Sequence, residues 1–134
     1  MYKKTIKYVD YDGNERTEDF YFNLTETEIT EWEYSEPGGM TAFIEKVVNT
    51  NEYTKMIPLW KKIILMSYGE KSPDGRRFIK SDELSTAFSQ TEAFNVMFME
   101  FAQNAEAATD FVNAVLPKSI SEKEAQSLTV LTNK

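Results

Sequence analysis

Apolar and polar residues alternate over two stretches near the start of the chain, residues 2–9 and residues 15–24. A period of two is typical of strands with one buried face, so these stretches predict a β-hairpin. A three-residue loop with Gly13 in the left-handed conformation pairs Asp10 with Asn14, and this register keeps one face apolar, whereas a two-residue turn would mix the faces. We expect the helices to cover that face, which carries Tyr2 opposite Phe22, Lys4 opposite Phe20, and Ile6.

From residue 25 onward the apolar positions recur every three or four residues, which is the spacing of helices with one buried face. We expect helices at about 26–34, 40–49, 52–68, 82–88, 90–103 and 105–116. Pro58 lies inside the third of these, so that helix either kinks there or starts afresh with proline in its first turn. Gly69 is expected to end it, and residues 76–80 are expected to be extended.

Several helix starts carry polar residues that can accept hydrogen bonds from the free backbone N–H groups of a first turn. The predicted caps are the capping boxes Thr25–Glu28 and Ser89–Glu92 and the single residues Ser81 and Asn104.

These elements predict the α+β class, with an N-terminal β-hairpin packed on a mostly helical bundle of five to six helices. Residues 1–117 are expected to form one domain, a usual size for a single core. Residues 118–134 contain no aromatic residue and few apolar ones. We expect them to form a weakly structured or disordered tail, because little apolar burial is available there to offset the entropy of ordering.

Composition removes several classes of protein. The 134 residues include no cysteine and no histidine, which excludes disulfides, thiolate nucleophiles and the commonest general base and metal ligand. We therefore expect no catalytic residue, no cofactor and no metal. The first residues form no signal peptide and no apolar run approaches about 18 residues, so a soluble, intracellular protein without a membrane partner is expected.

The net charge of −7 is concentrated in one part of the chain. Residues 15–36 contain eight acidic residues and one basic residue, and the rest is nearly neutral. Such a surface repels nucleic-acid backbones, so we expect no nucleic-acid partner. The carboxylate pairs at 26/28 and 31/33 favour a solvated helix face, and Asp10-x-Asp12-Gly13-Asn14 favours a turn over a calcium loop, because glycine and glutamate are missing from the required positions.

The most informative apolar segment is residues 94–101. Phe94, Met97, Phe98 and Phe101 share one helical face, whereas Val96 and Met99 point elsewhere. The segment fits a central core helix, and it also fits a Met- and Phe-rich groove for a partner's amphipathic helix. The candidate partner-binding residues are Val96, Met97, Met99 and Phe101, together with Arg76 and Arg77 of a loop at 68–77 that lacks a phosphate-binding pattern.

Several motifs lie along residues 1–117, and the main ones are Lys4-Thr5-Ile6-x-Tyr8-x-Asp10-Tyr11-Asp12-Gly13, Ser72-x-Asp74-Gly75-Arg76-Arg77-Phe78, Phe88-Ser89-Gln90-Thr91-Glu92-Ala93-Phe94 and Ala107-Ala108-x-x-Phe111-Val112-Asn113. With them the chain resembles the tail assembly chaperones of long-tailed bacteriophages that infect Gram-positive bacteria. It departs from that family at residues 115–117, where a glycine is expected, and in its long acidic tract.

The resemblance implies a non-enzymatic assembly factor that binds the tape measure protein, keeps it soluble and promotes assembly of the tail tube, with the major tail tube protein as a possible second partner. It also implies action in the cytoplasm of the infected bacterium, absence from the mature virion and, in many relatives, a longer frameshifted product. A second hypothesis is an acidic inhibitor that mimics nucleic acid and blocks a host defence protein. The acidic tract supports it, although residues 40–117 lack the regularly spaced charge that a mimic needs.

Overall fold

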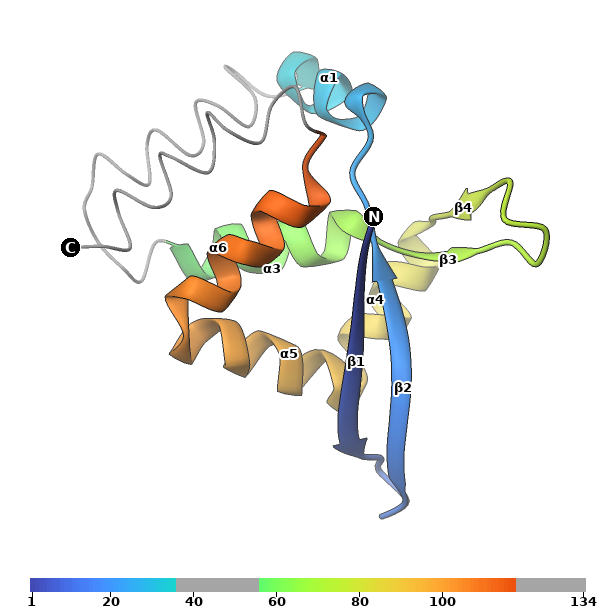
Figure 1. Ribbon diagram of the computed structural model, residues 1–134, viewed down its shortest axis with the longest axis vertical. Coiled ribbons are helices and arrows are strands. Elements are labelled where there is room, and N and C mark those ends of the chain that lie inside the picture. The colour runs from blue at the N-terminus through green and yellow to red at the C-terminus, as the bar shows by residue number, and fades with distance from the viewer. Residues whose placement is uncertain (36–55, 118–134) are drawn as a thin grey trace.

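The computed structural model describes residues 1–35 and 56–117 (Figure 1). The helix expected at 40–49 and the tail expected at 118–134 lie outside these residues. The described elements are, in chain order, β1 (Tyr2–Val9), β2 (Glu15–Phe22), α1 (Glu26–Ser35), α3 (Met56–Ser67), β3 (Tyr68–Lys71), β4 (Phe78–Ile79), α4 (Asp82–Ser89), α5 (Glu92–Gln103) and α6 (Ala105–Val115). The strands form one antiparallel sheet in the order β1-β2-β3-β4, which confirms the α+β class.

The N-terminal hairpin has the predicted register. Tyr2 lies opposite Phe22 and Lys4 opposite Phe20. The Asp10 backbone N–H donates to the Asn14 carbonyl at 2.9 Å, and Gly13 has a φ of 84°. The Asp10 carboxylate also accepts from the backbone N–H groups of Asp12 and Asn14, each at 2.9 Å, so the side chain closes the turn from inside.

Strand β3 was not predicted. Tyr68 and Gly69 were expected to end the third helix, but that helix stops at Ser67, and Tyr68 pairs with Phe22 in the sheet. Ser67 is buried, and its hydroxyl donates to the Ile63 carbonyl at 2.6 Å. Tyr68 continues the apolar spacing of the helix, so periodicity alone cannot separate it from the helix, and pairing with β2 decides its conformation.

One face of the hairpin forms the floor of the core, as predicted. Phe22 is fully buried, and its ring lies 5.8 Å from that of Phe88 in α4 and 5.5 Å from that of Phe111 in α6, measured between centroids. Ile6 is buried as well, and Tyr2 and Phe20 are partly buried against the same cluster. A hydrogen bond of 3.0 Å from the Leu24 N–H to the Val115 carbonyl joins the end of the hairpin to the end of α6.

Three of the four predicted caps are confirmed. In the Thr25–Glu28 capping box, the Glu28 N–H donates to the Thr25 hydroxyl at 3.1 Å, and the Thr25 N–H donates back to the Glu28 carboxylate at 2.9 Å. Ser81 caps α4, and Asn104 caps α6. Pro58 is the third residue of α3. The helix therefore starts afresh with proline in its first turn, which was one of the two expected alternatives to a continuous helix.

The capping box at Ser89 is wrong. Thr91 caps α5, with its hydroxyl accepting from the Phe94 N–H at 3.1 Å. Ser89 remains in the last turn of α4 and donates to the Thr86 carbonyl at 2.6 Å. Both residues can cap a helix, and α4 extends one residue further than its apolar pattern indicated.

Candidate protein-interaction surfaces

Helix α5 packs against β1 and buries the face that the sequence predicted. Met97 and Phe101 are 0% and 1% exposed and belong to the core, so they offer a partner no surface. Val96 and Met99 are 41% and 49% exposed. Of the four apolar candidates on this helix, only these two lie where another protein can reach them.

A third exposed apolar side chain, Tyr11 in the turn of the hairpin, lies near the exposed side of α5. Tyr11 is 72% exposed, and the Glu92 carboxylate near its hydroxyl raises the pKa of Tyr11. The Asn95 amide in turn donates to Glu92 at 2.9 Å. Because Val96 follows Asn95 and lies one turn from Glu92, these contacts bring the Tyr11 ring to the outer side of α5. We call Tyr11, Val96 and Met99 the α5 surface.

A second exposed element is the loop of residues 72–77 between β3 and β4, which projects from the body of the molecule (Figure 1). It is held by hydrogen bonds from the Ser72 N–H to the Arg77 carbonyl at 2.9 Å and from the Arg77 N–H to the Ser72 hydroxyl at 3.0 Å. The Ser72 hydroxyl and the Arg76 N–H donate to the Asp74 carboxylate, which lowers its pKa. The turn is thus ordered, and it presents Arg76 and Arg77 to solvent.

The structure does not bring the predicted arginines together with the predicted apolar residues. The α5 helix packs on β1, at one edge of the sheet, and the loop carrying Arg76 and Arg77 precedes β4, at the other edge. Neither guanidinium forms an ion pair within the described residues. The two groups therefore belong to separate surfaces.

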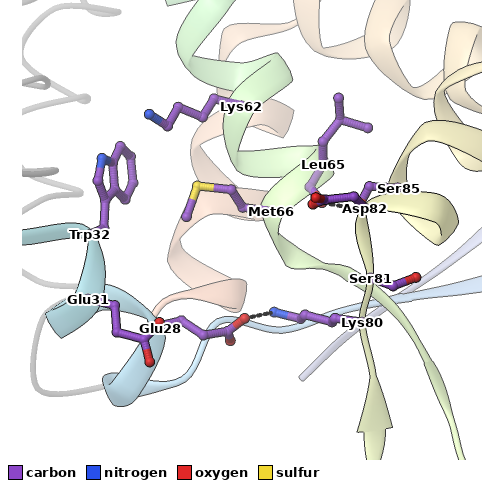
Figure 2. Close-up of a pocket in the computed structure, with 10 residues that line it drawn as sticks. All are labelled: Glu28, Glu31, Trp32, Lys62, Leu65, Met66, Lys80, Ser81, Asp82 and Ser85. Atoms are coloured by element: carbon purple, nitrogen blue, oxygen red, sulfur yellow. Dashed lines mark hydrogen bonds and ion pairs between the residues drawn. The ribbon is translucent and has the colours of Figure 1, made fainter. Parts of the chain in front are cut away.

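A groove that the sequence did not reveal lies between α1, α3 and the start of α4 (Figure 2). It has a volume of about 560 Å³. Its walls are Glu28, Glu31 and Trp32 from α1, Lys62, Leu65 and Met66 from α3, Lys80 and Ser81 from the link between β4 and α4, and Asp82 and Ser85 from α4. The three lining residues of α1 and the three of α3 each have the spacing i, i+3, i+4, so each trio shares one side of its helix. The sequence shows this spacing, but only the tertiary structure shows that the two helices face each other.

Lys80 anchors one end of the groove. Its ammonium group lies 2.6 Å from the Glu28 carboxylate and 2.5 Å from the Asn23 carbonyl. Burial lowers the pKa of Lys80, and the bond to Glu28 opposes that effect. Glu28, one of the acids expected on a solvated helix face, also has two structural roles, because one of its oxygens holds Lys80 and the other completes the capping box.

Three acidic side chains of the hairpin, Asp10, Glu18 and Asp19, form ion pairs on its exposed face. Arg16 lies 2.5 Å from the Asp10 carboxylate and 3.6 Å from that of Glu18, and Glu18 also accepts a hydrogen bond from Tyr8. Asp19 accepts from the Thr5 hydroxyl at 2.5 Å. The hairpin is therefore not a uniform field of free negative charge.

The described residues contain no cluster of three acidic side chains arranged to hold a metal ion. None of their helices combines the length and the apolar character needed to cross a bilayer.

Comparison with known proteins identifies the family. The model of the phage tail assembly chaperone family matches residues 1–133, further than the motifs at 1–117 extend. No curated protein and no solved structure gives a significant match. Since the family model covers nearly every residue, from the hairpin through α6 and beyond, the chain belongs to the phage tail assembly chaperones.

Proposed function

We propose that this chaperone binds apolar helical segments of the phage tape measure protein through the α5 surface and thereby promotes assembly of the tail tube. The observation that carries the proposal is the exposure of Val96 and Met99, 41% and 49%, on a helix whose other apolar side chains are buried or partly buried. Family membership implies a non-enzymatic role.

The chemistry of the α5 surface suits such a client. Methionine is flexible and polarisable, so Met99 can adapt to helices of differing shape. Tyr11 adds a broad, exposed ring with a polar hydroxyl at its edge, a combination that suits protein interfaces. The core beneath, with Phe94 and Phe101 buried, gives these side chains a rigid base.

Three parts of the proposal rest on family membership alone. The major tail tube protein is a possible second partner, the site of action is the cytoplasm of the infected bacterium, and the chaperone is not retained in the mature virion. Mass spectrometry of purified virions tests the last of these, and detection of the chaperone at the copy number of a tail component would contradict it.

The client contact is tested by co-expression with the phage's tape measure protein, followed by a pull-down at low and high salt. The client should remain bound at high salt, because apolar contacts are not screened as ion pairs are. The Val96→Ser/Met99→Ser variant should retain about a tenth of the bound client, a loss of ~1.4 kcal/mol, at an unchanged melting temperature. The matched control is Gln103→Ser, at an exposed position of α5 outside the α5 surface. A tape measure protein that fails to co-purify at either salt concentration contradicts the proposal.

The nucleic-acid mimic makes the opposite forecast. Its binding to a defence protein should collapse with salt and on neutralisation of Glu26, Glu28, Glu31 and Glu33. The pairing of Glu28 with Lys80, and of Asp10 and Glu18 with Arg16, removes part of the free charge on which a mimic depends. We therefore favour the chaperone function.

A further inference from the structure

The groove between α1, α3 and α4 has an apolar middle. Leu65 and Met66 line it and are only partly buried, so each presents some side-chain surface to the opening. Trp32 forms the α1 wall, with the Lys62 ammonium 4.6 Å from its ring centroid (Figure 2). The Ser85 hydroxyl donates to the Leu65 carbonyl at 2.9 Å, so α4 is fastened to α3 beside the opening. The volume of about 560 Å³ admits a few side chains of a partner.

The charges around the groove do not balance. Three carboxylates and two ammonium groups line it. Glu28 is neutralised by Lys80, whereas Lys62 keeps its positive charge over the Trp32 ring, so the lining has a net charge of −1. The carboxylates of Glu31 on α1 and Asp82 on α4 form no ion pair with any described residue, so the two opposite walls each carry a negative charge beside an apolar middle.

We propose that this groove is a second protein-binding site, which takes a segment of a partner protein that carries a bulky apolar side chain next to a lysine or arginine. The apolar side chain lies against Leu65 and Met66, and the carboxylates of Glu31 and Asp82 attract the cation. Because the groove joins an apolar middle to these carboxylates, it distinguishes basic from acidic segments. The proposal does not depend on the client contact of the α5 surface.

The test is a titration of the ¹⁵N-labelled full chain with blocked tetrapeptides, followed by NMR. The probe is acetyl-Ala-Leu-Arg-Ala-amide, and its matched controls are acetyl-Ala-Leu-Glu-Ala-amide and acetyl-Ala-Ala-Arg-Ala-amide. We expect saturable shifts at the Trp32 indole and at the amides of Leu65, Met66 and Ser85, with a millimolar Kd, and weaker binding of both controls. A Trp32→Phe variant assigns the indole signal.

Variants link the binding to the two carboxylates. Glu31→Gln/Asp82→Asn should weaken the arginine probe about fivefold, in the range of surface ion pairs. Glu83→Gln/Glu106→Gln, which removes the same charge outside the groove, should leave its Kd unchanged. If Asp82→Asn, at the first residue of α4, lowers the stability of the protein, the single variant Glu31→Gln is used in its place and should also weaken binding of the arginine probe.

Three outcomes would overturn the proposal: no saturable shift at the groove, equal affinity for the arginine and glutamate probes, or full affinity in Glu31→Gln/Asp82→Asn. Val96→Ser/Met99→Ser should bind the probe normally. A failed titration would therefore leave the pull-down result for the α5 surface untouched, and a failed pull-down would leave the titration untouched.

Discussion

The Lys80 ammonium lies 2.6 Å from the Glu28 carboxylate, although 52 positions separate the two residues in sequence. The same carboxylate accepts from the Thr25 N–H at 2.9 Å. Glu28 thus completes the first turn of α1 and also ties that helix to the residue that follows β4. Helix α1 is held by this bond and by the packing of Ile29 and Trp32, which are both buried.

Removing the charge of Glu28 should destabilise the protein. The Lys80 and Glu28 side chains are only 20% and 31% exposed, so Glu28→Gln leaves an ammonium group in a poorly solvated place. We expect a loss of about 1–3 kcal/mol in the free energy of unfolding, measured with urea. Lys80→Met should cost less, because it removes the charge and retains most of the apolar stem. A Lys80→Met variant less stable than Glu28→Gln would contradict this account.

Truncating the centre of the core should have a large effect. Phe22 is fully buried among aromatic rings, so Phe22→Ala should lower the free energy of unfolding by about 3–5 kcal/mol. Thr17→Ala, at an exposed position of the same strand, should change it by less than about 0.5 kcal/mol. Thermal denaturation of both variants checks the role of the hairpin. If Phe22→Ala loses no more stability than Thr17→Ala, the hairpin contributes little to the core.

Gly69 should not tolerate a side chain. A Cβ there would lie 2.7 Å from Phe78 Cε2 and 2.8 Å from the Ile79 carbonyl oxygen, so β4 would have to move. Gly69→Ala is expected to cost about 1–3 kcal/mol by urea denaturation. Gly13→Asn is the control, since asparagine tolerates a φ of 84° and a Cβ there meets nothing within 4 Å. A neutral Gly69→Ala variant would argue against the close approach of β4.

Two substitutions distinguish Thr91 from Ser89 as the N-cap of α5. Thr91→Ala removes the hydroxyl that accepts from the Phe94 N–H and should cost about 1 kcal/mol. Ser89→Ala removes only a bond to the Thr86 carbonyl in α4 and should cost about 0.5 kcal/mol or less. Equilibrium unfolding of both variants decides between the caps, and the reverse order would restore the capping box at Ser89.

The hairpin turn should lose stability in acid. The hydrogen bond from Arg16 lowers the pKa of Asp10, and the Asn14 and Asp12 N–H groups add to the effect. The folded state therefore binds this proton less tightly than the unfolded state, so the contribution is complete above about pH 3.8 and is lost as pH falls through the lowered pKa. The stability difference between the wild type and Asp10→Asn should shrink over that range. A carboxyl NMR titration of Asp10 with an ordinary midpoint would contradict the prediction.

Much of the local structure follows from the sequence because its causes lie within a few residues. The loop at Gly13 and the alternation on either side of it determine the hairpin register, since a slip of one residue would expose the apolar face. Thr25, Ser81 and Asn104 satisfy N–H groups three positions away, which makes them recognisable as caps. The buried side of α5 was equally predictable, because Phe94, Met97 and Phe101 recur at helical spacing.

Only the tertiary structure decided how these elements meet. Tyr68 has a spacing compatible with a helix, and its strand conformation depends on pairing with Phe22, 46 positions earlier in the chain. Periodicity could not show that Met97 and Phe101 leave no surface for a partner while Val96 and Met99 do, since that depends on what covers each side of α5. The groove of Glu31, Leu65 and Asp82 joins faces from three helices, and the charge balance of such a site exists only once distant residues, such as Glu28 and Lys80, have been brought together.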